Sequence, residues 1–314
     1  MKIRATTWAA ASGAVLLAAL ALWAISDNAR LFGLSLLNGL TLAALYFLVA
    51  SGFTLVFGLM RNVNLAHGSL FLLGGYLGYA VGDATGSWFL ALAVGFLSTA
   101  VTGVLLQWLI FRHMAGQDLR QTLVTLGLSI VLADCFLWIW GGETYQFDPP
   151  GWLMGVVTVP WVGKYSGFRL VVLASAVVIG VALWLFLNRT RVGMMIRAGV
   201  DDKQMLAASG VNVQKVFAIT FAIGAGLAGF AGVMGGTALS IAPGEDVRYL
   251  LASLVVVIVG GMGSIVGTAI GALLIGLAET FGLAYAPTYG VVFTFLIMVG
   301  VLAFRPQGLM GRAA

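Results

Sequence analysis

Few side chains in this sequence could carry out chemistry. It has two histidines, His67 and His113, one cysteine, Cys135, and no cluster of carboxylates. Catalysis by a nucleophile or an acid–base pair needs such groups together, and a metal site needs several ligands at suitable spacing. The pair Gly163-Lys164 lacks the other residues of a phosphate-binding loop. The sequence therefore predicts a protein that is not an enzyme and does not hydrolyse ATP by that route.

The composition explains why reactive groups are scarce. Of 314 residues, 61% are hydrophobic and 9% are charged, and 43 are glycine. Soluble domains carry roughly 25% charged residues, so most of this surface must face lipid. Disordered chains, disulfide scaffolds and nucleic-acid-binding domains are excluded. The net charge of +5 then reflects which loops face the cytoplasm.

Apolar stretches long enough to cross a bilayer, about 20 residues each, recur along the chain. The sequence predicts an all-α polytopic membrane protein with about eight to ten helical segments in one transmembrane domain, residues 1–314. The expected segments are 8–25, 32–60, 66–82, 88–111, 122–141, 168–188, 216–239, 250–278 and 288–304. The first fits either a retained helix or a cleaved signal peptide, and its length favours the helix.

Lysine and arginine set the expected orientation. They gather in alternate loops, which places these loops and both termini in the cytoplasm. The acidic residues 27, 83, 143, 148, 245, 246 and 279 fall on the opposite side. A single crossing over 250–278 would bring Arg305 outside, so this stretch must enter and leave from one face.

This distribution of charged loops predicts two glycine-broken hairpins. The 250–278 hairpin turns at Gly260-Gly261-Met262-Gly263-Ser264, and the 32–82 hairpin turns within 61–69. Glycine-rich segments follow both turns in the same orientation, which indicates a parallel internal repeat, although glycine is common in membrane helices and also recurs by chance.

The turns are the candidate substrate pathway. Irregular backbone inside a membrane is tolerated where protein or water satisfies it, and a helix N-terminus there would attract a substrate carboxylate. The candidate residues are Asn64, His67, Gly68, Ser69, Gly260, Gly261, Gly263 and Ser264. His67 equally fits a hydrogen-bonded structural histidine, and Asp134 within segment 122–141 fits either a functional acid or a helix–helix contact.

The longest basic loop, residues 189–215, contains a short helix signal. Asp201 and Asp202 can cap a helix of about two turns that stops at Gly210. Such a helix could dock onto another protein, whereas a solvated loop is the simpler interpretation from composition alone.

Several phrases together resemble the permease subunits of branched-chain amino acid ABC transporters. They are residues 36–40 (LLNGL), 57–68 (FGLMRNVNLAHG), 260–264 (GGMGS) and 304–309 (FRPQGL). The resemblance spans nearly the whole chain and implies a bacterial inner-membrane importer for branched-chain or related amino acids, urea or amides.

The resemblance also implies partners. These are a second, related permease, two cytoplasmic ATPases and an extracytoplasmic substrate-binding protein, with the lipid bilayer around them and no nucleic acid. No cofactor is expected on this chain, because the partner ATPases use the ATP. Family permeases contact the ATPases through an inner-loop helix, which matches residues 197–212 here, without the Glu-Ala-Ala of the better-known motif. The expected contacts are Arg197, Asp201, Asp202, Ala207, Ala208 and Gly210.

Two other functions compete. An ion-coupled secondary transporter also has broken helices, but it needs intramembrane ionisable groups, for which Asp134 and His67 are the candidates. A membrane scaffold would leave the paired turns without a role.

Overall fold

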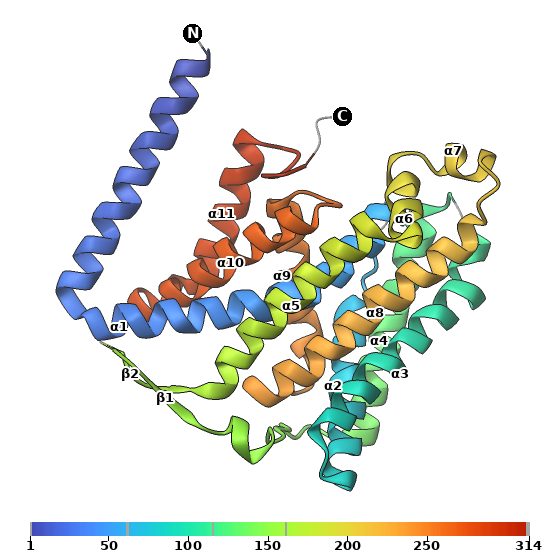
Figure 1. The fold of residues 1–314 in the computed structure, drawn as a ribbon, viewed down its shortest axis with the longest axis horizontal. Coiled ribbons are helices and arrows are strands. Elements are labelled where there is room, and N and C mark those ends of the chain that lie inside the picture. Colours follow the sequence, from blue (N-terminus) through green and yellow to red (C-terminus); the bar gives the residue numbers. More distant parts are fainter. Residues whose placement is uncertain (1, 61–62, 115, 161, 312–314) are drawn as a thin grey trace.

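The computed structural model describes residues 2–60, 63–114, 116–160 and 162–311. Helices make up most of this part of the chain (Figure 1). They are α1 (Lys2–Met60), α2 (His67–Thr85), α3 (Trp88–Leu109), α4 (Asp118–Trp140), α5 (Gly167–Arg189), α6 (Arg191–Asp201), α7 (Lys203–Ala208), α8 (Val213–Ala238), α9 (Glu245–Gly260), α10 (Ile265–Tyr285) and α11 (Gly290–Phe304).

Six of these described helices are long and apolar enough to cross a membrane. They are residues 28–60 of α1 together with α3, α4, α5, α8 and α10. The all-α polytopic prediction is therefore confirmed. One short two-stranded sheet, β1 (Val156–Val159) paired antiparallel with β2 (Gly163–Ser166), was not expected. It lies in the loop before α5, where β-branched residues favour strands.

α1 consists of two helices joined at Asn28, whose φ of −153° and ψ of 90° interrupt the helical backbone. The first part stands away from the bundle, and residues 28–60 run through its centre (Figure 1). At the end near Asn28, Arg30 Nε donates to the carbonyl of Val162, 3.1 Å away. We call this end the β-strand face, because β1 and β2 lie there. We call the opposite end, with α6 and α7, the basic face.

α1 and α8 cross antiparallel at the centre of the bundle. Leu59 packs with Phe217, Val56 packs with Phe221, and Gly52 meets Gly224. A Cβ on Gly52 would overlap the Gly224 carbonyl, and one on Gly224 would come within 2.8 Å of the Gly52 carbonyl. Lipid tails give helices no hydrophobic reason to associate, so backbone contact at small residues supplies the packing.

A short helix follows each of these central helices after a six-residue connection. α2 begins at His67, whose Nε2 lies 3.0 Å from the carbonyl of Val49, well back along α1. α9 begins at Glu245, and its next residue, Asp246, contacts Gly68 and Ser69 of α2. The starts of α2 and α9 therefore meet inside the bundle.

The two halves of the bundle have opposite directions. α3 runs antiparallel to α8, from Trp88 beside Thr237 to Gln107 beside Gln214. α10 runs antiparallel to α1 in the same way, from Thr268 beside Thr54 to Glu279 beside Tyr46. α1–α2–α3 thus corresponds to α8–α9–α10 with the membrane direction reversed. The order is that of an inverted repeat, which relates other segments than the parallel repeat predicted for the stretches after the two turns.

The predicted turn at 260–264 joins α9 and α10 into a close antiparallel hairpin. Gly260 meets Gly267 near the turn, and Arg248 meets Glu279 near the open end. The turn after α1 is different, because α2 packs along α8, α3 and α9. The packing of α2 against α8, which the sequence alone does not give, determines this difference.

The contact between α8, α2 and α3 gives a direct test of the packing. A methyl on Gly229 would overlap the carbonyl of Gly95 and the side chain of Thr99. We expect Gly229→Ala to lower the free energy of unfolding by about 1–3 kcal/mol through overpacking. Gly127→Ala in α4 is the matched control, because a Cβ there meets nothing within 4 Å. Thermal unfolding in detergent measures both, and equal melting temperatures would contradict the packing.

Candidate functional site: the basic face and the broken-helix interior

The basic face carries the short helix predicted from the sequence. Asp202 Oδ1 accepts hydrogen bonds from the backbone N–H groups of Gln204 and Met205, at 2.8 and 3.0 Å, and caps α7. Gly210 follows with a φ of +80°, a left-handed conformation that glycine adopts without strain. Asp caps and glycine stops act locally, which is why the sequence alone revealed this helix.

α6 and α7 pack directly on the ends of the central helices. Ile196 of α6 is buried with Leu59 of α1 and Phe217 of α8. Lys203 Nζ donates to the carbonyl of Met60, 3.0 Å away, and lies 5.5 Å from the ring centre of Phe217. A force on α7 would therefore reach both α1 and α8.

The opposite side of the two helices is exposed, and on it Arg197 donates to Asn188 Oδ1 at the end of α5, 2.8 Å away. Met205 is 67% exposed on this side. The exposed residues include all six predicted ATPase contacts, namely Arg197, Asp201, Asp202, Ala207, Ala208 and Gly210. Their exposure is compatible with docking, and the contact itself stays a prediction.

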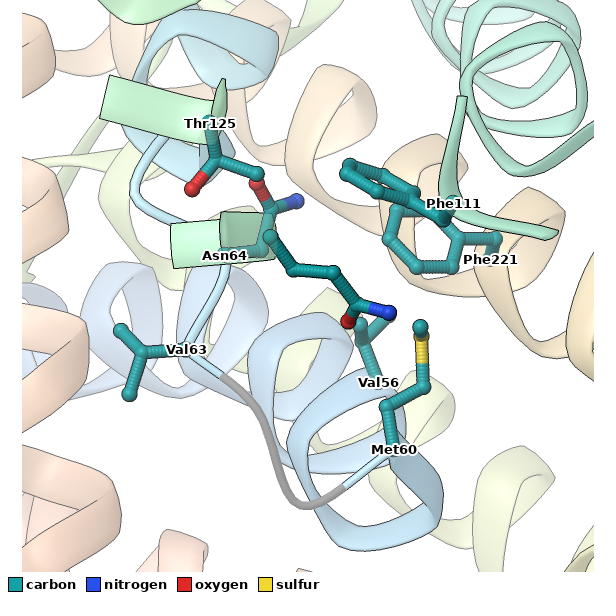
Figure 2. Close-up of a pocket in the computed structure, with 8 residues that line it drawn as sticks. Val56, Met60, Val63, Asn64, Phe111, Thr125 and Phe221 are labelled. Atoms are coloured by element: carbon teal, nitrogen blue, oxygen red, sulfur yellow. The ribbon is translucent and has the colours of Figure 1, made fainter. Parts of the chain in front are cut away.

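The first candidate turn lies beside α4. Arg61 and Asn62 are outside the described residues, whereas Asn64 is buried and its Oδ1 accepts a hydrogen bond from Ala66. Its Nδ2 has no partner and borders a cavity of about 10 Å³, the space of about one water molecule (Figure 2). Thr125 of α4 accepts a hydrogen bond from the backbone of Leu65. This turn is therefore held by polar contacts with α4.

His67 occupies a fully enclosed position at the start of α2. Its Nε2 bonds the Val49 carbonyl, its ring packs edge-on against Phe53, and its Nδ1 has no partner. Of the two roles considered for this residue, these contacts are those of a structural histidine that joins α2 to α1.

The N-terminus of α2 faces a carboxylate of the chain itself. Ser69 donates to Asp246 Oδ2 at 3.4 Å, and a Cβ on Gly68 would overlap the Asp246 carbonyl. Asp246 is 4% exposed, and its Oδ1 has no partner. The positive end of a helix stabilises a negative charge, and here Asp246 occupies the place expected for a substrate carboxylate.

The second turn lies on another side of α1. A Cβ on Gly263 would lie 3.6 Å from Gly58 and 3.9 Å from Val200 of α6, and Ser264 caps α10 by accepting from the backbone N–H of Gly267. Gly260 and Gly261 contact the segment after α11, where Met310 N donates to the Gly260 carbonyl at 2.9 Å. Position 58 lies on the opposite face of α1 from Val56 and Met60, which border the cavity at the first turn. The structure therefore keeps the two candidate turns apart.

The interior also contains ionisable residues that were predicted from the sequence to lie in outer loops. Asp246 begins α9, and Glu279 lies within α10, where it accepts a hydrogen bond from Tyr46 at 2.6 Å and pairs with Arg248. Asp134, the expected intramembrane acid, is exposed on α4. Hydropathy windows end at charged residues, and only the pairing of α9 with α10 and α1 shows that these charges lie inside.

A family model described as the permease component of branched-chain amino acid transport systems matches residues 35–302. The chain is 28% identical to the high-affinity branched-chain amino acid permease BraD of Pseudomonas aeruginosa over 292 residues, 88% of this chain and 95% of BraD. It is 30% identical to LivH of Escherichia coli K12 over 311 residues, 92% of this chain and 98% of LivH.

A ribose import permease, RbsC of Escherichia coli K12, is 29% identical over 266 residues, 77% of this chain and 75% of RbsC. No solved structure matches the chain. The family match begins in α1 and ends in α11, so it includes both turns, α6 and α7, and the ionisable residues of α9 and α10. The chain therefore belongs to the family of permease components of branched-chain amino acid transport systems.

Proposed function

We propose that this chain is a transmembrane subunit of an ATP-driven importer for branched-chain or related amino acids. The observation that carries this proposal is the geometry of the basic face. α6 and α7 expose one side and are anchored by the other to α1 and α8, so an attached motor could move the two central helices together.

The partners follow from the family and from the chemistry of this chain. The basic face lies in the cytoplasm, with both termini on that side, and two ATPase subunits dock there. A second, homologous permease completes the pathway, and an extracytoplasmic binding protein delivers the solute to the β-strand face. The described residues contain no group of three or more His, Cys, Asp or Glu side chains that could hold a metal. We assign no cofactor or enzymatic activity to this chain, and ATP is hydrolysed by its partners.

The structure adds ionisable residues that an ion-coupled secondary transporter could use, but two other observations favour the ATP-driven importer. Glu279 and Arg248 are ionisable residues of the bundle, yet they pair with each other. Coupling helices at the basic face have no purpose in a transporter that works alone. The match to RbsC shows that the family architecture accompanies more than one named solute, so the choice of amino acid substrate rests on the greater coverage of the BraD and LivH matches.

The first prediction concerns the energy source. We expect the complete complex in proteoliposomes to import radiolabelled leucine only with ATP, ATPases and binding protein present. Uptake is followed with each component omitted, and with a proton or sodium gradient in place of ATP. Gradient-driven uptake by the permease alone would contradict the proposal.

The second prediction separates the cap on α7 from an ionic contact with the ATPase. Asp202→Ala removes the acceptor for two N–H groups, at a cost of about 1 kcal/mol, whereas asparagine caps nearly as well as aspartate. We expect Asp202→Ala to lower ATP-driven uptake severalfold and Asp202→Asn to stay close to the wild type. Equal loss in both variants would show that the charge itself is needed.

A further inference from the structure

Four polar residues join α1, α9 and α10, and we call them the ion-pair cluster: Tyr46, Glu245, Arg248 and Glu279. Arg248 lies 3.4 Å from Glu245 Oε2 and 3.4 Å from Glu279 Oε1. Tyr46 donates to the other oxygen of Glu279 at 2.6 Å. The cluster therefore has one cation and two anions, and Tyr46 fixes one of the anions.

The cluster lies at membrane depth. The crossing part of α1 has 33 residues and is about 50 Å long, whereas the hydrocarbon layer is about 30 Å thick. Tyr46 lies about 27 Å from Asn28 and about 21 Å from Met60 at the helical rise. No 30 Å layer crossed by this helix can leave Tyr46 out, and the hydrogen bond holds Glu279 at the same depth.

The cluster is also partly open. The side chains of Arg248 and Glu245 are 47% and 30% exposed, while Tyr46 is buried. Elsewhere at membrane depth, the exposed faces of α4 and α5 present Leu, Ile, Val and Trp, as expected against lipid. An ionised side chain facing hydrocarbon is costly, so such groups face a water-filled cavity or another protein. The open side of α9 therefore does not face lipid.

We propose, on the basis of the proposed function, that the ion-pair cluster lines the translocation pathway and transiently binds the zwitterionic head of the amino acid. Arg248 receives the carboxylate, and Glu245 and Glu279 receive the ammonium group.

The geometry of the ion pairs suits a passing ligand. Their 3.4 Å separations exceed the roughly 2.7–2.9 Å of strong charge-assisted bonds, so the pairs are loose and Arg248 retains donors for a second acceptor. An amino acid carries a carboxylate and an ammonium group on the same carbon. Its carboxylate can replace a glutamate at Arg248, and its ammonium group can replace Arg248 at a glutamate. Such an exchange leaves the net charge of the site unchanged and permits release, which transport requires.

The test uses the complete complex in proteoliposomes, with binding protein loaded with radiolabelled leucine. We expect Arg248→Gln to lower uptake at least tenfold, with assembly retained and ATPase activity within twofold. Arg248→Lys keeps the charge but loses the planar fork, so we expect an intermediate rate. Arg120→Gln, an exposed arginine at the start of α4, is the matched control and should stay within twofold.

Three outcomes of this experiment would overturn the inference. The first is wild-type uptake in Arg248→Gln. The second is loss of assembly with the second permease, which would make the cluster a subunit contact. The third is recovery of uptake when Arg248→Glu is combined with Glu279→Arg, which would make the ion pair structural. Absence of ATP-driven uptake in the wild type would instead refute the proposed function.

A second measurement does not depend on transport. Leu251 lies one turn beyond Arg248 and is exposed, as is Val178 on α5. In a Cys135→Ser background, we expect Leu251→Cys to react with a charged, water-soluble thiol reagent, more slowly when millimolar leucine is present. Val178→Cys should not react. An unreactive Leu251→Cys, or a rate that leucine does not change, would overturn the inference.

Discussion

The crossing of α1 and α8 at Gly52 and Gly224 is the contact on which the rest of the fold depends. Only glycine permits the two backbones to approach this closely. In lipid, such close packing and the satisfaction of polar groups replace the hydrophobic effect as the forces that join helices. Because the central helices are so close, α2 and α9 can start beside them inside the bundle, and Asp246 can reach the N-terminus of α2.

The same crossing connects the two regions to which we assign function. α1 carries Leu59 and Met60 at the basic face, where α6 and α7 pack, and Tyr46 in the ion-pair cluster. A displacement of α7 and a change around Arg248 would therefore involve one continuous helix. This is a mechanical route by which ATP hydrolysis on a partner could alter the exposure of a solute site, without any catalytic group on this chain.

Local signals in the sequence predicted local structure well. Asp202 and Gly210 delimited α7, and the loop charges required the hairpin at 260–264. What depended on the packing between distant helices could not be predicted in this way. Three features require α8 and α10 to pack against α1. They are the inverted relation of α1–α3 to α8–α10, the meeting of Gly68 with Asp246, and the burial of Tyr46 beside Glu279. Hydropathy assigned residues 245, 246 and 279 to loops because it scores a charge without its partner.

The meeting of α2 and α9 inside the membrane can be tested most directly by cross-linking. Ser69→Cys and Asp246→Cys are introduced together in a Cys135→Ser background, with a protease site in the loop after Gly151, and native membranes are oxidised. The arrangement predicts a disulfide that holds the two protease fragments together until reduction. Separate fragments from this pair, together with a disulfide between Ser69→Cys and Ser264→Cys, would contradict it, because the two glycine turns would then converge.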